Sequence, residues 1–238
     1  MRGRSAGDET ALREYLYETH VHTSPVSRCA VATPEETVTF YREMGYDGLF
    51  LTNHFLDGNI GIDFDRPYAE KIEFYFSDYE KALQIGREQS FKVFPGVEFS
   101  YGGTDFLIYG LDKAWYLAHP EIMTLSKREE LALMKSAGAF IVQAHPFRER
   151  DYIDHIRLYP RSVEAVEVLN LGNSEQANRM AELYAAQYGL AMVAGTDNHM
   201  AGAQRSLAGI KTQTPLCSVE DYIDAVRAGK TEIFRIDR

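Results

Sequence analysis

Histidines and carboxylates recur along this chain at the ends of apolar segments. Five of the seven histidines and three carboxylates are placed in this way. They are His20, His22, His54, Glu98, Asp105, His145, Asp197 and His199. Imidazole and carboxylate donors without a thiolate suit Zn, Fe or Mn better than an all-oxygen Mg site. The pattern therefore predicts a divalent metal site.

The spacing of these residues supports a shared site. His20 and His22 lie two apart on a predicted strand, so their side chains point to the same face and can bind one ion together. Barrel enzymes place their sites at the carboxyl ends of strands, and a central carboxylate such as Glu98 can bridge two ions. Any one of these residues has an ordinary structural reading, such as a helix cap at Asp197. The joint occurrence at successive strand ends favours the metal site.

Apolar, β-rich segments alternate with helix-like segments from start to end. Strands are expected at 15–22, 46–54, 91–99, 104–109, 139–145, 163–169, 190–196 and 231–236, and helices at 33–45, 67–89, 126–138, 173–188 and 218–228. This alternation predicts right-handed βαβ units with parallel strands. About seven units favour a barrel over an open doubly wound sheet, because no glycine-rich phosphate loop follows the first strand.

Length and composition fit one α/β domain that covers residues 1–238. The chain has 238 residues, 45% of them hydrophobic, and a formal net charge of −10. This acidity disfavours binding of long nucleic acids. No apolar run approaches the roughly 20 residues that cross a bilayer, and the first 15 residues lack the apolar core of a signal peptide. A cytoplasmic protein that does not bind membranes is expected.

The two cysteines, Cys29 and Cys217, do not form a CxxC pair. Neither a disulfide framework nor a zinc knuckle is therefore expected.

Five motifs in this order resemble those of the PHP (polymerase and histidinol phosphatase) superfamily. They are HVHTS, TNHF, GVEFS, AHPF and GTDNH, and they span about residues 15–200. The resemblance implies a single-domain distorted (β/α)7 TIM-like barrel, two or three divalent ions, and a phosphoesterase activity. It places a first ion on His20, His22, Glu98 and Asp197. It also implies that Glu98 bridges to a second ion on His145, and that His54 and His199 serve a third.

The chain departs from the family at three places. The family often has a further His or Asp shortly after its HxH motif, where this chain has Ser27, Arg28 and Cys29. The third site is therefore weak, absent, or completed by Cys29 or water, or else Arg28 places a positive charge there. Asp105 stands where the family usually has a histidine, as a ligand or as a partner of one. Asn53 stands where the family usually has an aspartate.

The expected reaction is metal-assisted hydrolysis of a small phosphorylated metabolite or nucleotide. A hydroxide that bridges two ions would attack phosphorus in line, and Asp197 or His199 would move a proton toward the leaving group. Arginine binds phosphate oxygens well. Arg148 is the first candidate for this role, followed by Arg205 and Arg28.

Three other functions remain open on the sequence alone. A nuclease for short oligonucleotides would use the same donors. A metal-stabilised module that binds without turnover belongs to another class, and the missing third-site ligand keeps it in view. Amide hydrolysis also occurs in related metal barrels, although no lysine ends a strand here to form their usual carbamylated site.

Overall fold

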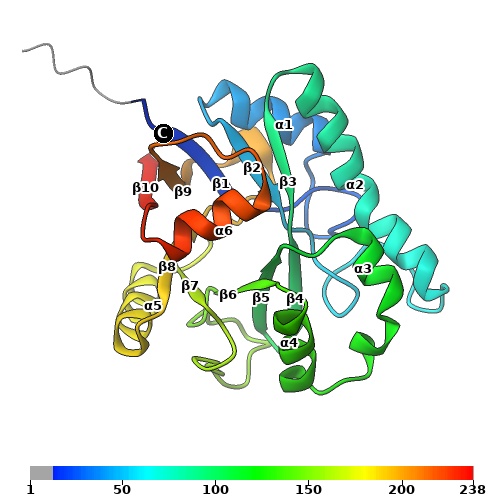
Figure 1. Ribbon diagram of the computed structural model, residues 1–238. Coiled ribbons are helices and arrows are strands. Elements are labelled where there is room, and N and C mark those ends of the chain that lie inside the picture. The colour runs from blue at the N-terminus through cyan, green and yellow to red at the C-terminus, as the bar shows by residue number, and fades with distance from the viewer. Residues whose placement is uncertain (1–12, 238) are drawn as a thin grey trace, which may run out of the picture.

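The computed structural model describes residues 13–237, whose ten strands form two sheets of five strands each (Figure 1). The first sheet has the order β10-β9-β1-β2-β3 and the second β4-β5-β6-β7-β8. The strands are β1 (Tyr15–Val21), β2 (Gly48–Leu51), β3 (Lys92–Pro95), β4 (Val97–Tyr101), β5 (Thr104–Tyr109), β6 (Phe140–Ala144), β7 (Ala165–Asn170), β8 (Ala191–Gly195), β9 (Ser206–Thr212) and β10 (Glu232–Asp237).

The expected single (β/α)7 barrel is wrong, because the described strands form two mixed sheets and no closed ring. In a closed barrel the last parallel strand would pair with the free edge of β1. Here β9 pairs antiparallel with that strand, from Tyr15 opposite Thr212 to Tyr17 opposite Ile210. Between β8 and β9, an isolated bridge between Val21 and Asn198 and a hydrogen bond from Asp197 N–H to the His20 carbonyl link the chain to β1 without a strand pairing.

Antiparallel pairing also interrupts the expected run of parallel strands. β4 and β5 form a hairpin through Gly102 and Gly103, which have φ of +55° and +83°. Positive φ at both central residues is the requirement of the tight hairpin turn that suits twisted strands, and glycine meets it without strain. The expected strand 91–99 is divided at Gly96, so that β3 pairs with β2 while β4 pairs with β5 in the other sheet.

The described residues form six α-helices, and the five expected helices are confirmed with small changes at their ends. They are α1 (Pro34–Glu43), α2 (Tyr68–Glu88), α3 (Lys113–Ala118), α4 (Lys127–Ser136), α5 (Glu175–Tyr188) and α6 (Val219–Arg227). The hydroxyl of Thr33 accepts the N–H of Glu36, whose carboxylate accepts the N–H of Thr33 in return. This capping box fixes the start of α1 at Pro34, within one residue of the expected start. Helix α3 and strand β9 were not predicted.

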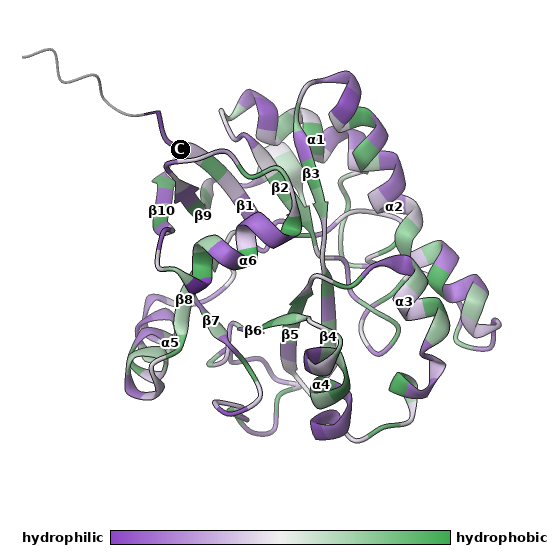
Figure 2. Cartoon of the chain, in the orientation of Figure 1, coloured by the Kyte–Doolittle hydropathy of each residue, from purple (hydrophilic) through white to green (hydrophobic). Residues whose placement is uncertain are grey.

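Helix α6 joins the two sheets at the end of the molecule opposite the predicted site. The ring of Tyr222 in α6 lies 4.6 Å from Phe50 of the first sheet and 6.0 Å from Phe140 of the second, between ring centroids. Figure 2 shows hydrophobic residues along the strands, whereas the helices on the outside also carry hydrophilic residues. Burial of these aromatic rings ties the sheets together, since each ring removes a large apolar area from water.

The structure tests two expectations about location only in part. Among residues 13–237, no helix has both the length and the apolar character that crossing a bilayer requires. The expectation that no signal peptide is present falls largely on residues 1–12, which lie outside the described part of the chain.

Candidate metal centre

The structure brings all eight predicted metal ligands together. Four groups of three residues have potential ligand atoms within 4.8 Å of one another, and the groups share members. They are His22, His54 and His199; His20, His145 and Asp197; His20, His22 and Glu98; and Glu98, Asp105 and His145. We refer to these eight residues as the central cluster.

The central cluster lies where the two sheets meet. Its members belong to the carboxyl ends of β1, β2, β6 and β8, to β4, and to the start of the antiparallel strand β5. An isolated bridge between His54 and Glu98 links the sheets on one side, and the bridge between Val21 and Asn198 links them on the other. Side chains from both sheets can therefore point into one space, as the expected strand-end site requires.

The backbone around the site is unusual at two of these residues. His145 and Asp197 have φ of +27° and +57°, in a region that few residues other than glycine adopt. Such strain persists where surrounding structure enforces it, and it is frequent at functional sites. Gly195, two residues before Asp197, allows a close approach, because a Cβ there would lie 2.4 Å from the Cβ of His20.

Four donor groups surround one point at the centre of the cluster. The Nε2 atoms of His20 and His22 are 3.1 Å apart. Glu98 oxygens lie 3.3 Å and 3.4 Å from these two nitrogens, and Asp197 Oδ1 lies 3.5 Å and 3.2 Å from them. Ligands at the usual 2.0–2.1 Å from a tetrahedral zinc ion are about 3.3 Å apart. The spacing of these atoms matches that of a metal coordination shell.

Glu98 connects this group of donors to a second one. Its Oε1 lies 3.2 Å from His145 Nε2, which is in turn 3.8 Å from Asp105 Oδ2. Oε2 of Glu98 lies 2.6 Å from His54 Nδ1. The Glu98 carboxylate thus faces donors on three sides, the arrangement of a bridging ligand.

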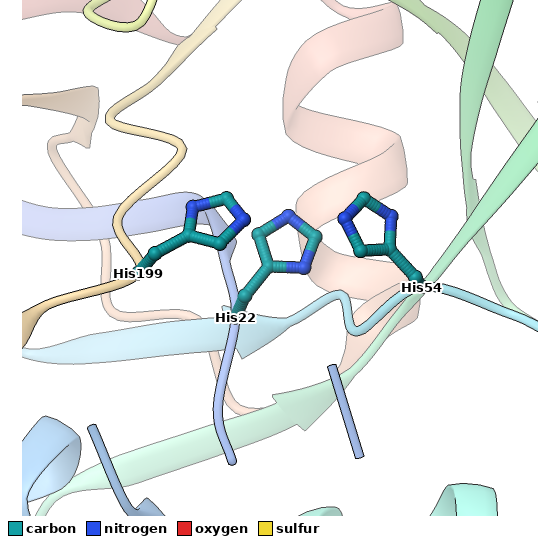
Figure 3. Close-up of side chains that lie close together, drawn as sticks. All are labelled: His22, His54 and His199. Atoms are coloured by element: carbon teal, nitrogen blue, oxygen red, sulfur yellow. The ribbon is translucent and has the colours of Figure 1, made fainter. Parts of the chain in front are cut away.

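Three imidazoles of the cluster, those of His22, His54 and His199, lie side by side (Figure 3). The His22 ring stands between the other two, with centroid distances of 4.4 Å to His54 and 4.3 Å to His199. The thiol of Cys29 lies near both His199 and His54. Burial raises the pKa of this thiol, but those two histidines lower it to about 6.

Glu167 of β7 orients two predicted ligands and was not singled out from the sequence. Its Oε1 accepts a hydrogen bond from His20 Nδ1 at 2.9 Å, and its Oε2 accepts one from the backbone N–H of His145 at 3.1 Å. Donation from Nδ1 leaves the lone pair of His20 Nε2 free for an ion. The available signal was a carboxylate inside an apolar strand, since Glu167 is fully buried.

Ser27 and Asn53 orient His22 in a similar way. The Ser27 hydroxyl donates to Asn53 Oδ1 at 2.8 Å, so it can accept from His22 Nδ1 at 3.2 Å and from the His54 N–H at 3.0 Å. This arrangement directs Nε2 of His22 toward the donors of the centre. The asparagine that replaces the usual aspartate therefore supports the ligands from outside.

Another buried carboxylate, that of Glu18, connects chain segments where the two sheets meet. It accepts the backbone N–H groups of His20 and Thr196 at 2.9 Å each and the hydroxyl of Tyr41 at 2.7 Å. Burial raises its pKa to about 7 even though these bonds favour the charged form. Glu18 links β1 to the exit of β8, so it fixes where His20 and Asp197 meet.

The electrostatics of the centre keep two of its carboxylates, Glu98 and Asp197, ionised, whereas burial and the nearby Glu98 raise the pKa of Asp105. Burial alone would raise the pKa of Glu98, but His54 and His20 hold it well below the ordinary value. Burial also acts against ionisation of Asp197, and His20 and Arg148 hold its pKa well below the ordinary value. The pKa of His22 is well below normal because of burial and the neighbouring His199 and His54. Anionic carboxylates and a neutral imidazole are the forms that bind metal ions.

Arg148 forms an ion pair with Asp197 through Nη2 and Oδ2. It also donates hydrogen bonds to Asn170 and Asn173, at 3.2 Å and 3.1 Å. The two carboxylate oxygens of Asp197 thereby face different partners: Oδ1 faces the histidines and Oδ2 faces the guanidinium. The side chain of Arg148 retains 14% exposure, so one edge of it is accessible to a substrate.

The other two predicted phosphate-binding arginines lie apart from the central cluster. Arg28 is exposed, and its backbone N–H donates to Asn59. Arg205 is exposed and lines a hollow of about 250 Å³ that also includes Asn173, a partner of Arg148. The structure thus brings Arg148 to the centre and leaves Arg28 and Arg205 at its margins.

The two roles predicted for His199 compete for one nitrogen. Its Nδ1 lies 2.9 Å from the backbone carbonyl of Asp197, to which it donates. Only Nε2 is left, either to bind an ion or to carry a proton. The proton-transfer role of Asp197 and His199 therefore stays a prediction.

Comparisons with known proteins support the fold through structure alone. No protein-family profile matches the sequence, and no curated protein does. Solved structures do match. One is a two-domain protein from Bacteroides vulgatus that contains a predicted PHP-like metal-dependent phosphoesterase, with a TM-score of 0.70 and 14% identity. The alignment covers 93% of this chain, which spans only 65% of the length of that protein.

Two further structures match over nearly their whole length. A candidate metal-dependent phosphoesterase from Bifidobacterium adolescentis has a TM-score of 0.54 and 14% identity, over 89% of this chain and 95% of that one. An amidohydrolase from Chromobacterium violaceum, with bound sulfate and no metal, has a TM-score of 0.56 and 16% identity, over 92% and 97%. At these identities the likeness is one of fold. It confirms the structural resemblance to PHP-like proteins that the motifs predicted.

Proposed function

We propose that this chain is a metal-dependent hydrolase of phosphate esters that acts on a small phosphorylated molecule. The observation that carries the proposal is the convergence of five histidines and three carboxylates on one space, at distances that suit metal ligands. The fold shared with proteins described as metal-dependent phosphoesterases supports it.

The donor set fits divalent ions better than it fits a purely structural cluster. Among the described residues, Glu98 Oε2 and His54 Nδ1 lie 2.6 Å apart without forming a hydrogen bond, and His145 Nδ1 is also buried without a hydrogen-bond partner. Buried polar atoms are almost always satisfied, so such exceptions call for an explanation. A bound ion supplies one for Glu98, whose oxygens face the ring nitrogens of His20, His22 and His145.

Two groups of donors accommodate two ions, one on His20, His22, Glu98 and Asp197 and the other on Glu98, Asp105 and His145. Divalent ions at these positions would supply a hydroxide nucleophile at neutral pH and neutralise charge on the phosphoryl group. Glu167 and Ser27 hold the imidazoles in the required orientation. Arg148 fixes Asp197 and presents its exposed edge to phosphate oxygens, a role that suits a planar guanidinium.

The test combines metal analysis with a phosphatase screen. Protein purified without chelator is expected to contain two or three divalent ions per chain and to release phosphate from small monoesters or diesters, with a gain on added Mn²⁺ or Zn²⁺. Glu98→Gln should lose more than about 100-fold in kcat/KM, because even residues outside the ligand shell cost 10–100-fold. Glu121→Gln, which changes an exposed carboxylate, serves as the control.

Two outcomes would contradict the proposal. Metal-loaded protein that releases no phosphate from monoesters, diesters or nucleotides would leave a module that binds without turnover. Amine release from amides, without phosphate release, would assign the same centre to the chemistry named for the Chromobacterium protein.

A further inference from the structure

Helix α4 and the chain segment before β7 enclose a hollow that contains none of the predicted metal ligands. Its volume is about 500 Å³, within the range of sites for small molecules. We call it the α4 hollow, and its residues belong to one face of α4 and to the segment 158–162. Three of these residues are cationic, four are apolar and two carry hydroxyl groups.

The cations of the α4 hollow stand around an apolar surface. Arg128, Leu131 and Lys135 follow one another at intervals of three and four residues, so they share one face of the helix. Leu131 is buried, whereas Arg128 and Lys135 are exposed about one turn on either side of it. Across the hollow, Leu158 is 40% exposed and Arg161 is exposed as well. A ligand with a negative group and an apolar part would fit this arrangement.

These three cations lack partners in the protein. Among residues 13–237, the side chains of Arg128, Lys135 and Arg161 form no ion pair or hydrogen bond, and no carboxylate lines the α4 hollow. Elsewhere the acidic surface pairs its cations well, since Lys113 and Lys211 each contact two carboxylates. The α4 hollow is therefore a local positive site in a chain with a net charge of −10.

One wall of the α4 hollow is held in place by a buried residue. Gln143 of β6 donates from Nε2 to the carbonyl of Arg157 at 2.7 Å and accepts the N–H of Tyr159 at 3.1 Å. The Tyr159 ring packs on Phe106, with 5.2 Å between centroids. Phe106 follows Asp105 in β5, so the two side chains point to opposite faces of the sheet. The wall is thus formed before a ligand binds, and the sheet separates it from the central cluster.

From these observations we propose that the α4 hollow binds a small organic phosphate, with its phosphate among the three cations and its apolar part against Leu131 and Leu158. Two guanidinium groups and one ammonium group match a doubly charged phosphate, and arginine binds its oxygens in pairs. The inference goes beyond the proposed function and does not rest on it, because no residue of the central cluster lines the α4 hollow.

A second hollow, beside α1, provides a contrast within the same molecule. Its volume is about 540 Å³, and it includes the exposed apolar side chains of Val31 and Met200. The charged residues that line it are Glu35, Glu36 and Glu43. This α1 hollow thus resembles the α4 hollow in size and apolar character but has the opposite charge. An anionic ligand that binds through charge and shape should enter only the α4 hollow.

The test uses phenylphosphonate, which carries a doubly charged head on a phenyl ring and has no ester bond that a phosphatase cleaves. It is titrated into metal-loaded, isotope-labelled full-length protein while backbone amide signals are followed by NMR. Signals of residues 128–135 and 158–162 should shift in a saturable manner, whereas signals around the α1 hollow should not. Inorganic phosphate and benzyl alcohol should each bind more weakly, because each lacks one half of the ligand.

Single substitutions locate the binding. Arg161→Gln and Lys135→Gln should each raise the dissociation constant at the α4 hollow about 10-fold, since each removes a charged hydrogen-bond donor. Lys230→Gln removes the same charge just after α6 and should leave the constant unchanged. All three side chains are exposed, and the amide spectrum of each variant shows directly whether it is folded.

The results separate this inference from the proposed function. Absence of shifts at 128–135 and 158–162, equal affinity for inorganic phosphate, or an equal loss of affinity in Arg161→Gln and Lys230→Gln would overturn the inference. Phosphate release by protein without those shifts would leave the phosphoesterase proposal standing. Saturable shifts at the α4 hollow in protein that hydrolyses no phosphoester would support the new site and refute the proposed function.

Discussion

The central cluster can be compared with a second group of charged residues, Asp57, Lys127 and Glu130, which we call the lysine cluster. In the lysine cluster, Lys127 Nζ lies 3.1 Å from Asp57 Oδ2 and 2.6 Å from Glu130 Oε2. The side chains of Lys127 and Glu130 are only 8% and 3% exposed. Nζ also lies 5.3 Å above the centroid of the Phe99 ring, a favourable cation–π distance.

The difference lies in how the two clusters satisfy their own polar atoms. The lysine cluster carries its own cation, and its side chains neutralise one another. The central cluster brings together carboxylates and nitrogen lone pairs, and several of its buried atoms lack a hydrogen-bond partner in the part of the chain that the structure describes. Burial of charge is costly unless the charge is paired. The comparison indicates that the central cluster requires a bound cation, whereas the lysine cluster already contains one.

Metal removal should produce the largest difference between the two clusters. An ion at 1,000 times its dissociation constant stabilises the folded state by about 4 kcal/mol. A chelator should therefore lower the free energy of unfolding by about this amount, as measured by urea denaturation with and without Zn²⁺. The chelator should lower the free energy of unfolding by the same amount in a variant in which a residue of the lysine cluster is replaced. Equal stability of the stripped and loaded protein would show that the central cluster is complete without an ion.

The lysine cluster should respond most strongly to loss of its internal cation. Lys127→Met leaves Glu130 buried beside Asp57 without a counter-charge, and removal of one partner of a buried pair costs about 3 kcal/mol. Urea denaturation measures this change, with Arg128→Met as an exposed control on the same helix. Metal content per folded chain should not change. A variant that loses its metal would show that the two clusters are coupled.

The comparison also explains what the sequence could predict. The donors of the central cluster were found because strand alternation places His20 and His22 on one face, and because the ends of parallel strands meet. These rules are local, and they hold whether or not the sheet closes. The site could therefore be located although the predicted barrel was wrong.

Whether the barrel closes depends on long-range pairing between strands, which local sequence patterns do not encode. β9 occupies the edge of β1 at Tyr15–Tyr17, about 200 residues away along the chain. Its sequence, SLAGIKT, shows no strong alternation. The supporting residues escaped prediction for a related reason. The carboxylate of Glu167 inside an apolar strand was a signal, but the roles of Glu167 and Ser27 become recognisable only when the partners that they orient, His20 and His22, are seen beside them.

A smaller effect is expected where the central cluster depends on a residue that touches no ion. Glu167→Gln weakens the acceptor of His20 Nδ1–H, so metal affinity should fall by about 10–100-fold. Competition with a metal-binding dye measures this affinity. Glu164→Gln is the matched control, because Glu164 precedes the same strand and pairs with Arg227 on the outside. Unchanged affinity in Glu167→Gln would mean that the imidazole is held by packing alone.

The smallest effect should appear in the lysine cluster as a change in pH dependence. Burial raises the pKa of Glu130 from 4.5 to about 7, although Lys127 lowers it. Between about pH 4.5 and 7 the unfolded chain loses this proton before the folded one does, so wild-type stability should decline as pH rises through this window. Glu130→Gln cannot ionise and should remove that decline.

At pH 8 the Glu130→Gln variant should therefore be more stable than wild type by about 1 kcal/mol, since replacing a buried ion pair is often neutral or stabilising. Lys127 would keep Asp57 as its counter-charge. Urea denaturation at pH 5 and pH 8 measures the stability of both proteins, which should be nearly equal at pH 5. A variant that is less stable than wild type at pH 8 would mean that the ion pair outweighs the cost of burial. The lysine cluster would then stabilise the folded protein. The contrast between its internally paired charges and the central cluster would be larger than we infer.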